Sequence, residues 1–127
     1  MVEDVSEQIY AMHAQVCKTL ADSKRLRIIN VLRDGEMTVG DMARALGLRQ
    51  ANLSQHLTLL RERGVVTTRR QGLNIYYSLS SPKIVQACEL MREVLAEHLA
   101  RSAQLSRDLQ TTAEAGSSPA INAPRRV

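Results

Sequence analysis

The chain has 127 residues, which is enough for one compact domain with a short tail and excludes multidomain machinery. Its apolar runs are too short to span a bilayer, and its two cysteines, Cys17 and Cys88, are too far apart for a zinc finger of ordinary spacing; we therefore expect a soluble, cytoplasmic protein with no membrane partner. The net charge is only +4, but the segment 44–83 holds seven basic residues and one acid, as is typical of a face that binds a polyanion.

The chain contains no Phe and no Trp, so its core has to be aliphatic, which favours a mainly α-helical fold. Asp22 and Ser23 offer an N-cap for a second helix. Thr38 and Asp41 open a third helix as a capping-box variant, and Gly47 ends it. The spacing of apolar residues predicts helices at 5–20, 24–33, 39–46 and 50–63, with buried positions at Leu26, Ile29, Leu32, Leu53, Leu57 and Leu60.

The hydrophobic period changes after Gly64, where β-branched and aromatic residues predict two strands at 65–70 and 75–79. The four residues between them, 71–74, are typical of a turn, so we expect a small β-hairpin. Ser81 and Pro82 then mark the start of a last helix of about 28 residues.

That last helix carries a coiled-coil-like apolar seam, which one small domain cannot bury by itself. We therefore expect a symmetric homodimer joined through the terminal helices. The domain should cover residues 1–110, and the Ala, Ser, Pro and Gly composition of 111–127 is typical of a disordered tail. The seam consists of Ile84, Cys88, Met91, Leu95, His98, Ser102, Leu105 and Leu109.

Two short helices joined by a tight turn, the second rich in small polar residues and followed by a basic hairpin, are the layout of a winged helix-turn-helix. The second helix would enter the major groove of double-stranded DNA, and the hairpin, or wing, would lie beside the backbone or a minor groove. A dimer would hold two such helices about 34 Å apart and favour an inverted-repeat operator. The candidate DNA contacts are Gln50, Asn52, Ser54, Gln55, His56 and Arg61 on the helix, and Arg69, Arg70 and Asn74 on the wing.

Three segments of the chain resemble the ArsR/SmtB (arsenical-repressor) family of bacterial winged-helix regulators across roughly residues 12–99. They are LADSKRLRIINVL, EMTVGDMARALGLRQANLSQHLTLLRERGVV and RRQGLNIYYSL. The resemblance implies a homodimer that represses its own operon and leaves the DNA when an inducer binds or oxidises it. It also implies DNA-facing positions on the helix 50–63 and wing contacts at Arg70, Gln71, Gly72 and Asn74.

The inducer remains open between three hypotheses, because the family's metal-binding cysteines on the third helix correspond to Thr38 and Gly40, and its last-helix site is reduced to His98. In the first, Cys17 and Cys88 form a thiol switch for an oxidant or a reactive sulfur species. In the second, His13 joins both cysteines to bind a thiophilic ion such as arsenite, cadmium or zinc; no cofactor is otherwise implied. In the third, both cysteines are small buried hydrophobes.

We expect no enzymatic activity, because the sequence has no phosphate-binding glycine loop, no HExxH and no paired carboxylates in an apolar setting. The alternative of another class is a winged helix that serves only as a protein-interaction module. Loss of DNA affinity in Arg70→Ala would distinguish DNA binding from that alternative.

Overall fold

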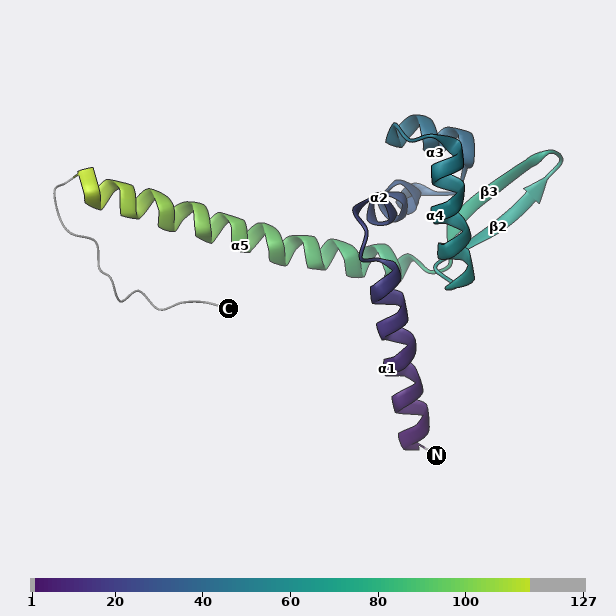
Figure 1. The fold of residues 1–127 in the computed structure, drawn as a ribbon, viewed down its shortest axis with the longest axis horizontal. Coiled ribbons are helices and arrows are strands. Elements are labelled where there is room, and N and C mark those ends of the chain that lie inside the picture. The colour runs from purple at the N-terminus through teal and green to yellow at the C-terminus, as the bar shows by residue number, and fades with distance from the viewer. Residues whose placement is uncertain (1, 115–127) are drawn as a thin grey trace. The chain divides into compact units, whose positions relative to one another are not determined.

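The computed structural model describes residues 2–114 and divides the chain into two units, 1–88 and 89–127, of which the second is represented by the remainder of the last helix. The helices and strands follow the order expected of a winged helix-turn-helix, with a 3-10 turn and a short first strand in addition (Figure 1). They are α1 (Val2–Thr19), α2 (Ser23–Val31), η1 (Leu32–Asp34), β1 (Met37–Thr38), α3 (Val39–Leu46), α4 (Gln50–Glu62), β2 (Val66–Gln71), β3 (Asn74–Leu79) and α5 (Pro82–Glu114).

The predicted caps of α2 and α3 are present. The Asp22 side chain accepts hydrogen bonds from the backbone N–H groups of Lys24 and Arg25 at 2.8 and 3.3 Å. Thr38 Oγ1 accepts the N–H of Asp41 at 3.2 Å, but the Asp41 carboxylate binds Arg44 instead of returning to the cap. The capping box that we predicted at α3 is therefore only half formed.

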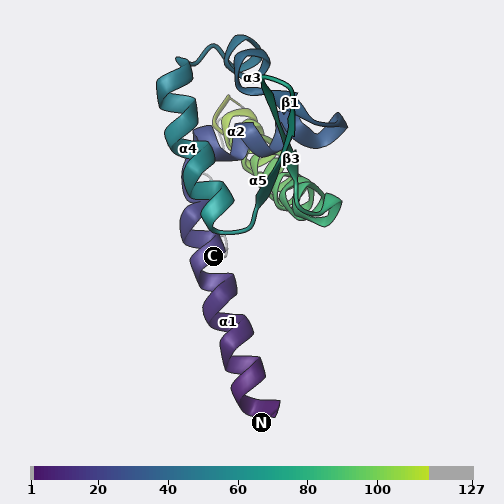
Figure 2. The same ribbon diagram turned by 90° about the vertical axis from the view of Figure 1, so that its right-hand side faces the viewer.

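The hairpin belongs to a three-stranded antiparallel sheet in the order β1-β3-β2 (Figure 2). We did not predict β1, whose Met37 and Thr38 pair with Tyr77 and Tyr76 of β3. The connection between β2 and β3 is also tighter than expected, since Gln71 and Asn74 are paired and the turn contains two residues instead of four. Gly72 occupies its first position with a φ of +63°, a conformation that favours glycine and fits a type II′ turn.

The core lies within residues 1–88 and joins α2, α3, α4, the sheet and the first turn of α5. Leu26 was predicted to be buried but is exposed, and Ile28, which we did not predict, takes its place with none of its surface exposed. The reason is that the buried face of α2 is centred between positions 28 and 29, one residue away from the stripe that we chose. The buried apolar residues are Ile28, Ile29, Leu32, Met42, Ala43, Leu53, Leu57, Leu60, Val65, Val66 and Val85.

The helix α5 continues to Glu114, beyond the end at residue 109 and the domain limit at 110 that we expected. The rest of the predicted tail, 115–127, lies outside the described residues. Among residues 2–114, no helix has the length and hydropathy needed to cross a membrane.

Candidate nucleic-acid interface

The helices α3 and α4 form a helix-turn-helix because Gly47 ends α3 in the left-handed conformation, with a φ of +67°. The next N–H, that of Leu48, returns to the carbonyl of Ala43 at 3.1 Å, and α4 begins two residues later. Three leucines of α4, at 53, 57 and 60, are completely buried and fix its inner face. The opposite face of α4 is therefore presented to solvent in a defined orientation.

The exposed face of α4 is polar and carries one positive charge. Ser54, Gln55 and Arg61 are exposed, as the sequence predicted, and so is Gln50 in the first turn. Thr58 lies on the same face, and its hydroxyl donates to the carbonyl of Ser54 at 2.9 Å. We did not include Thr58 among the predicted contacts, although its i,i+4 spacing from Ser54 indicates the shared face.

His56 and Asn52 are half-buried, unlike the other predicted contact residues of α4. We expected His56 to face outward, but its Nδ1 accepts a hydrogen bond from Nε of Arg25 at 3.1 Å. This bond requires the tautomer with the proton on Nε2. Arg25 also donates from Nη1 to the carbonyl of Thr19 at 2.8 Å, so one guanidinium joins the end of α1 to α4.

Asp22 stands next to this junction. Partial desolvation raises its pKa, but the N–H groups of Arg25 and Lys24 that it accepts, together with the neighbouring positive charges of His56 and Arg25, hold the pKa of Asp22 below its ordinary value. The carboxylate therefore stays ionised at neutral pH and keeps α2 capped.

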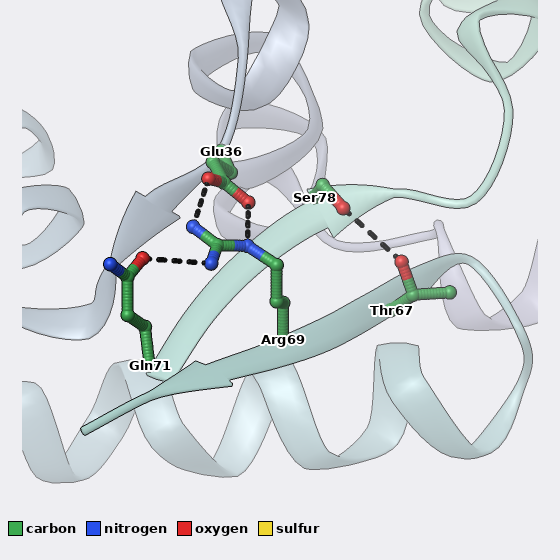
Figure 3. A network of polar contacts seen from close by, with 5 residues as sticks. All are labelled: Glu36, Thr67, Arg69, Gln71 and Ser78. Atoms are coloured by element: carbon green, nitrogen blue, oxygen red, sulfur yellow. Dashed lines mark hydrogen bonds and ion pairs between the residues drawn. The ribbon is translucent and has the colours of Figure 1, made fainter. Parts of the chain in front are cut away.

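Arg69 of the wing is bound to the body of the domain (Figure 3). Its Nε and Nη2 donate to the two carboxylate oxygens of Glu36 at 3.1 and 2.5 Å, and its Nη1 donates to Oε1 of Gln71 at 2.8 Å. Its guanidinium also lies 4.8 Å from the ring centre of Tyr76, its cross-strand partner. The hydrogen bonds of Arg69 hold the pKa of Glu36 below its usual value, and Glu36 in turn raises the pKa of Arg69.

The remaining predicted wing residues are exposed at or near the hairpin turn: Arg70 and Gln71 on β2, Gly72 in the turn and Asn74 on β3. Between Gly72 and Asn74 stands Leu73, which is fully exposed and was not predicted to matter. The structure thus assigns two different environments to the neighbouring arginines, one paired at the base of the wing and the other open to solvent.

Both cysteines are free thiols, Cys17 exposed on α1 and Cys88 half-buried on the first part of α5, where it packs against the core. His13 is also exposed on α1. Among the described residues, no three His, Cys, Asp or Glu side chains are grouped as a metal site requires. A metal bound by His13 and the two cysteines would therefore need ligands from two subunits.

The profile of the family described as "Bacterial regulatory protein, arsR family" matches residues 22–68, which include α2, α3, α4 and the start of the wing. An uncharacterised HTH-type transcriptional regulator of Mycobacterium tuberculosis, Rv0081, is 38% identical over 106 residues, or 83% of this chain and 93% of the relative. The transcriptional activator HlyU of Vibrio cholerae is 38% identical over 80 residues, or 63% of this chain and 74% of the relative.

Among solved structures, the homodimeric winged helix-turn-helix DNA-binding domain of a possible ArsR-family regulator from Mycobacterium bovis superimposes with a TM-score of 0.70 at 32% identity, covering 77% of this chain and 91% of that one. These similarities extend over the core, the helix-turn-helix and the wing, and the proteins concerned are regulators of transcription, not enzymes. The chain belongs to the ArsR family of bacterial DNA-binding transcriptional regulators.

Proposed function

We propose that the protein is a homodimeric repressor that binds an inverted-repeat operator in double-stranded DNA. The observation that carries this proposal is the exposed polar face of α4, with Ser54, Gln55 and Thr58, in the same unit as a wing whose Arg70 is open to solvent. Gln can pair with base edges in the major groove, and Arg70 can neutralise a phosphate. A bound dimer blocks RNA polymerase where its operator overlaps a promoter.

The dimer is supported by two apolar helix faces without a partner. On α1, Val5, Ile9 and Met12 are exposed at helical spacing, and on α5 the predicted seam residues Met91 and Leu95 are exposed as well. Such faces are uncommon on monomers, and they fit association with a second copy. The homodimer described for the related M. bovis domain supports the same assembly.

DNA binding would be tested by fluorescence anisotropy with operator fragments from the upstream region of the regulated operon. The exposed α4 residue Gln55, changed to Ala, should lower the affinity for the operator but leave binding to an unrelated duplex nearly unchanged, because a base contact carries sequence information. The matched control is Gln104→Ala on α5. Equal affinity of wild type and Gln55→Ala for the operator would contradict the proposed groove contact.

The sign of regulation needs its own measurement, because the relative HlyU is named as an activator. In transcription reconstituted from purified polymerase and the operator–promoter fragment, the proposal expects less transcript as protein is added. An increase in transcript would overturn repression while leaving DNA binding intact.

We further propose that an oxidant or a reactive sulfur species releases the repressor through Cys17 and Cys88. The two thiols lose two electrons and two protons to the oxidant and become a disulfide or a sulfur-bridged link. Cys17 is exposed and accessible to such a reagent, and Cys88 packs against the core that positions α4, so a bond at Cys88 can alter that packing. We place this chemistry in the cytoplasm, where thiols stay reduced until an oxidant arrives.

The competing inducer is a thiophilic ion held by His13 and the cysteines of two subunits. Reduced protein on its operator would be challenged with persulfide, peroxide, arsenite, cadmium and zinc, with mass spectrometry of the cysteines alongside. The thiol switch predicts release by persulfide or peroxide that disappears in Cys17→Ser and in Cys88→Ser. Release by a metal or metalloid ion that is abolished in His13→Ala would replace the switch with the metal site.

A further inference from the structure

A basic pocket lies away from the exposed face of α4, at the place where the end of α1, the start of α2 and the second half of α4 meet. Both ribbon views place these three segments side by side (Figures 1 and 2). The pocket has a volume of about 410 Å³ and lies entirely within residues 1–88. Its lining consists of Gln15, Lys18, Thr19, Arg25, Leu59 and Arg63.

The lining contains three cations and no carboxylate. Lys18, Arg25 and Arg63 come from three different helices or their caps, so their convergence depends on the fold and is not a run of charge in the sequence. Three positive charges around one cavity repel one another and attract a multivalent anion. The nearest described acid, Asp22, already accepts two backbone N–H groups as the cap of α2.

Arg25 retains hydrogen-bonding capacity for a ligand. A guanidinium has five N–H donors, and the described contacts of Arg25 use two of them, one to Thr19 and one to His56. These two bonds fix the guanidinium in place, which lowers the entropy that a ligand must overcome on binding. Arg63 and Lys18 are exposed and can close on the same ligand.

We propose that this pocket binds a small organic dianion, a phosphate monoester or a dicarboxylate, and that occupancy weakens operator binding. A volume of this order accommodates more than a bare phosphate and fits a small metabolite. Lys18, Arg25 and Arg63 bind its charged oxygens, Arg25 in the planar geometry that suits carboxylate and phosphate, and Leu59 packs against its carbon skeleton.

The coupling to DNA runs through α4, which supplies both the pocket and the exposed face. An anion on Arg25 competes for the guanidinium that holds His56, one residue after Gln55, and it also cancels positive charge near the DNA-binding helix. Both effects act in the same direction. Because coupling is reciprocal, operator DNA must weaken binding of the anion by the same factor. This second half of the proposal rests on the proposed operator binding, whereas the binding of the anion does not.

The first experiment measures anion binding to the full chain without DNA, by isothermal titration calorimetry with phosphoenolpyruvate, succinate and inorganic phosphate at constant ionic strength. We expect saturable binding at one site per chain, with phosphoenolpyruvate or succinate tighter than inorganic phosphate. Lys18→Gln and Arg63→Gln should each weaken binding about tenfold, as removal of a charge-assisted hydrogen bond does. Arg107→Gln, which removes the same charge from α5 outside the pocket, should leave it unchanged.

The second experiment adds the better anion to the protein–operator complex and follows anisotropy, with chloride at equal ionic strength as the reference. We expect a loss of operator affinity of at least about fivefold, absent in Arg63→Gln. Absence of saturable binding, or equal binding by Arg63→Gln and wild type, would overturn the pocket. Binding without any effect on the operator would overturn the coupling. If no anion binds but Arg63→Gln lowers operator affinity and its salt dependence, the pocket is a DNA backbone contact and the proposal is wrong.

Discussion

The apolar seam of α5 gives the sharpest test of the dimer. Leu95 is 52% exposed, so roughly half of its side chain remains to be buried against a partner. Complete burial of a leucine contributes about 1.5–3 kcal/mol, which leaves about 0.8–1.5 kcal/mol per protomer and about twice that for the two symmetric copies. Leu95→Ala should therefore raise the dimer dissociation constant by roughly 10- to 150-fold.

Sedimentation equilibrium over a range of protein concentrations measures this change directly. The matched control is Leu90→Ala, since Leu90 is a leucine of the same helix, is 62% exposed and lies away from the seam. Circular dichroism would verify that both variants keep the helix content of the wild type. An unchanged dissociation constant in Leu95→Ala, or an equal increase in Leu90→Ala, would refute the assignment of the seam as the dimer interface.

Three further predictions concern the wing. Arg70→Ala should lower operator affinity and reduce the salt slope of binding by about 1 for each phosphate that the arginine neutralises, measured by anisotropy against salt concentration; an unchanged slope would contradict binding of Arg70 to the backbone. Because Arg69 lowers the pKa of Glu36 below its ordinary value of 4.5, the stabilisation from this ion pair is complete above that value and disappears as pH falls through the lower folded pKa, so in urea unfolding the stability difference between wild type and Glu36→Gln should vanish towards about pH 2; a difference that persists there would point to another cause. Gly72→Ala should destabilise the domain by roughly 1 kcal/mol in thermal unfolding, since the φ of +63° strains any residue with a Cβ, whereas Gly40→Ala, within α3 and with its new Cβ at ordinary contact distance from Gln50, should be neutral or stabilising.

The elements that the sequence predicted well are those with strong local signals. Thr38 at the start of α3 and Gly47 at its end each fix a helix boundary by a single interaction, and both boundaries were correct. The strand β1 lacks such a signal, because two residues can form a strand only when β3 supplies the hydrogen-bonding partners. Leu26 failed for a related reason: on a nine-residue helix, a shift of one position still satisfies the apolar spacing.

The candidate interface divides in the same way. Periodicity alone indicates which side of α4 is buried, and therefore that Ser54 and Gln55 are exposed. It cannot indicate that His56 binds Arg25, because the two residues lie 31 positions apart and meet only after α2 packs against α4. The ion pair between Arg69 and Glu36, separated by 33 positions, was invisible for the same reason.

The adjacent arginines of the wing show how neighbouring residues of one type acquire separate tasks. Successive side chains of a strand point to opposite faces, so Arg69 and Arg70 cannot share an environment. Arg69 pairs across the sheet with Tyr76 and reaches Glu36, the residue before β1, which ties the outer strand β2 to the other edge of the sheet. Since that bond fixes the direction of the hairpin, it also fixes where Arg70 can meet a phosphate. The acidic residue Glu36 thereby supports binding of a polyanion, because the orientation it gives to the wing outweighs the repulsion of one half-exposed charge.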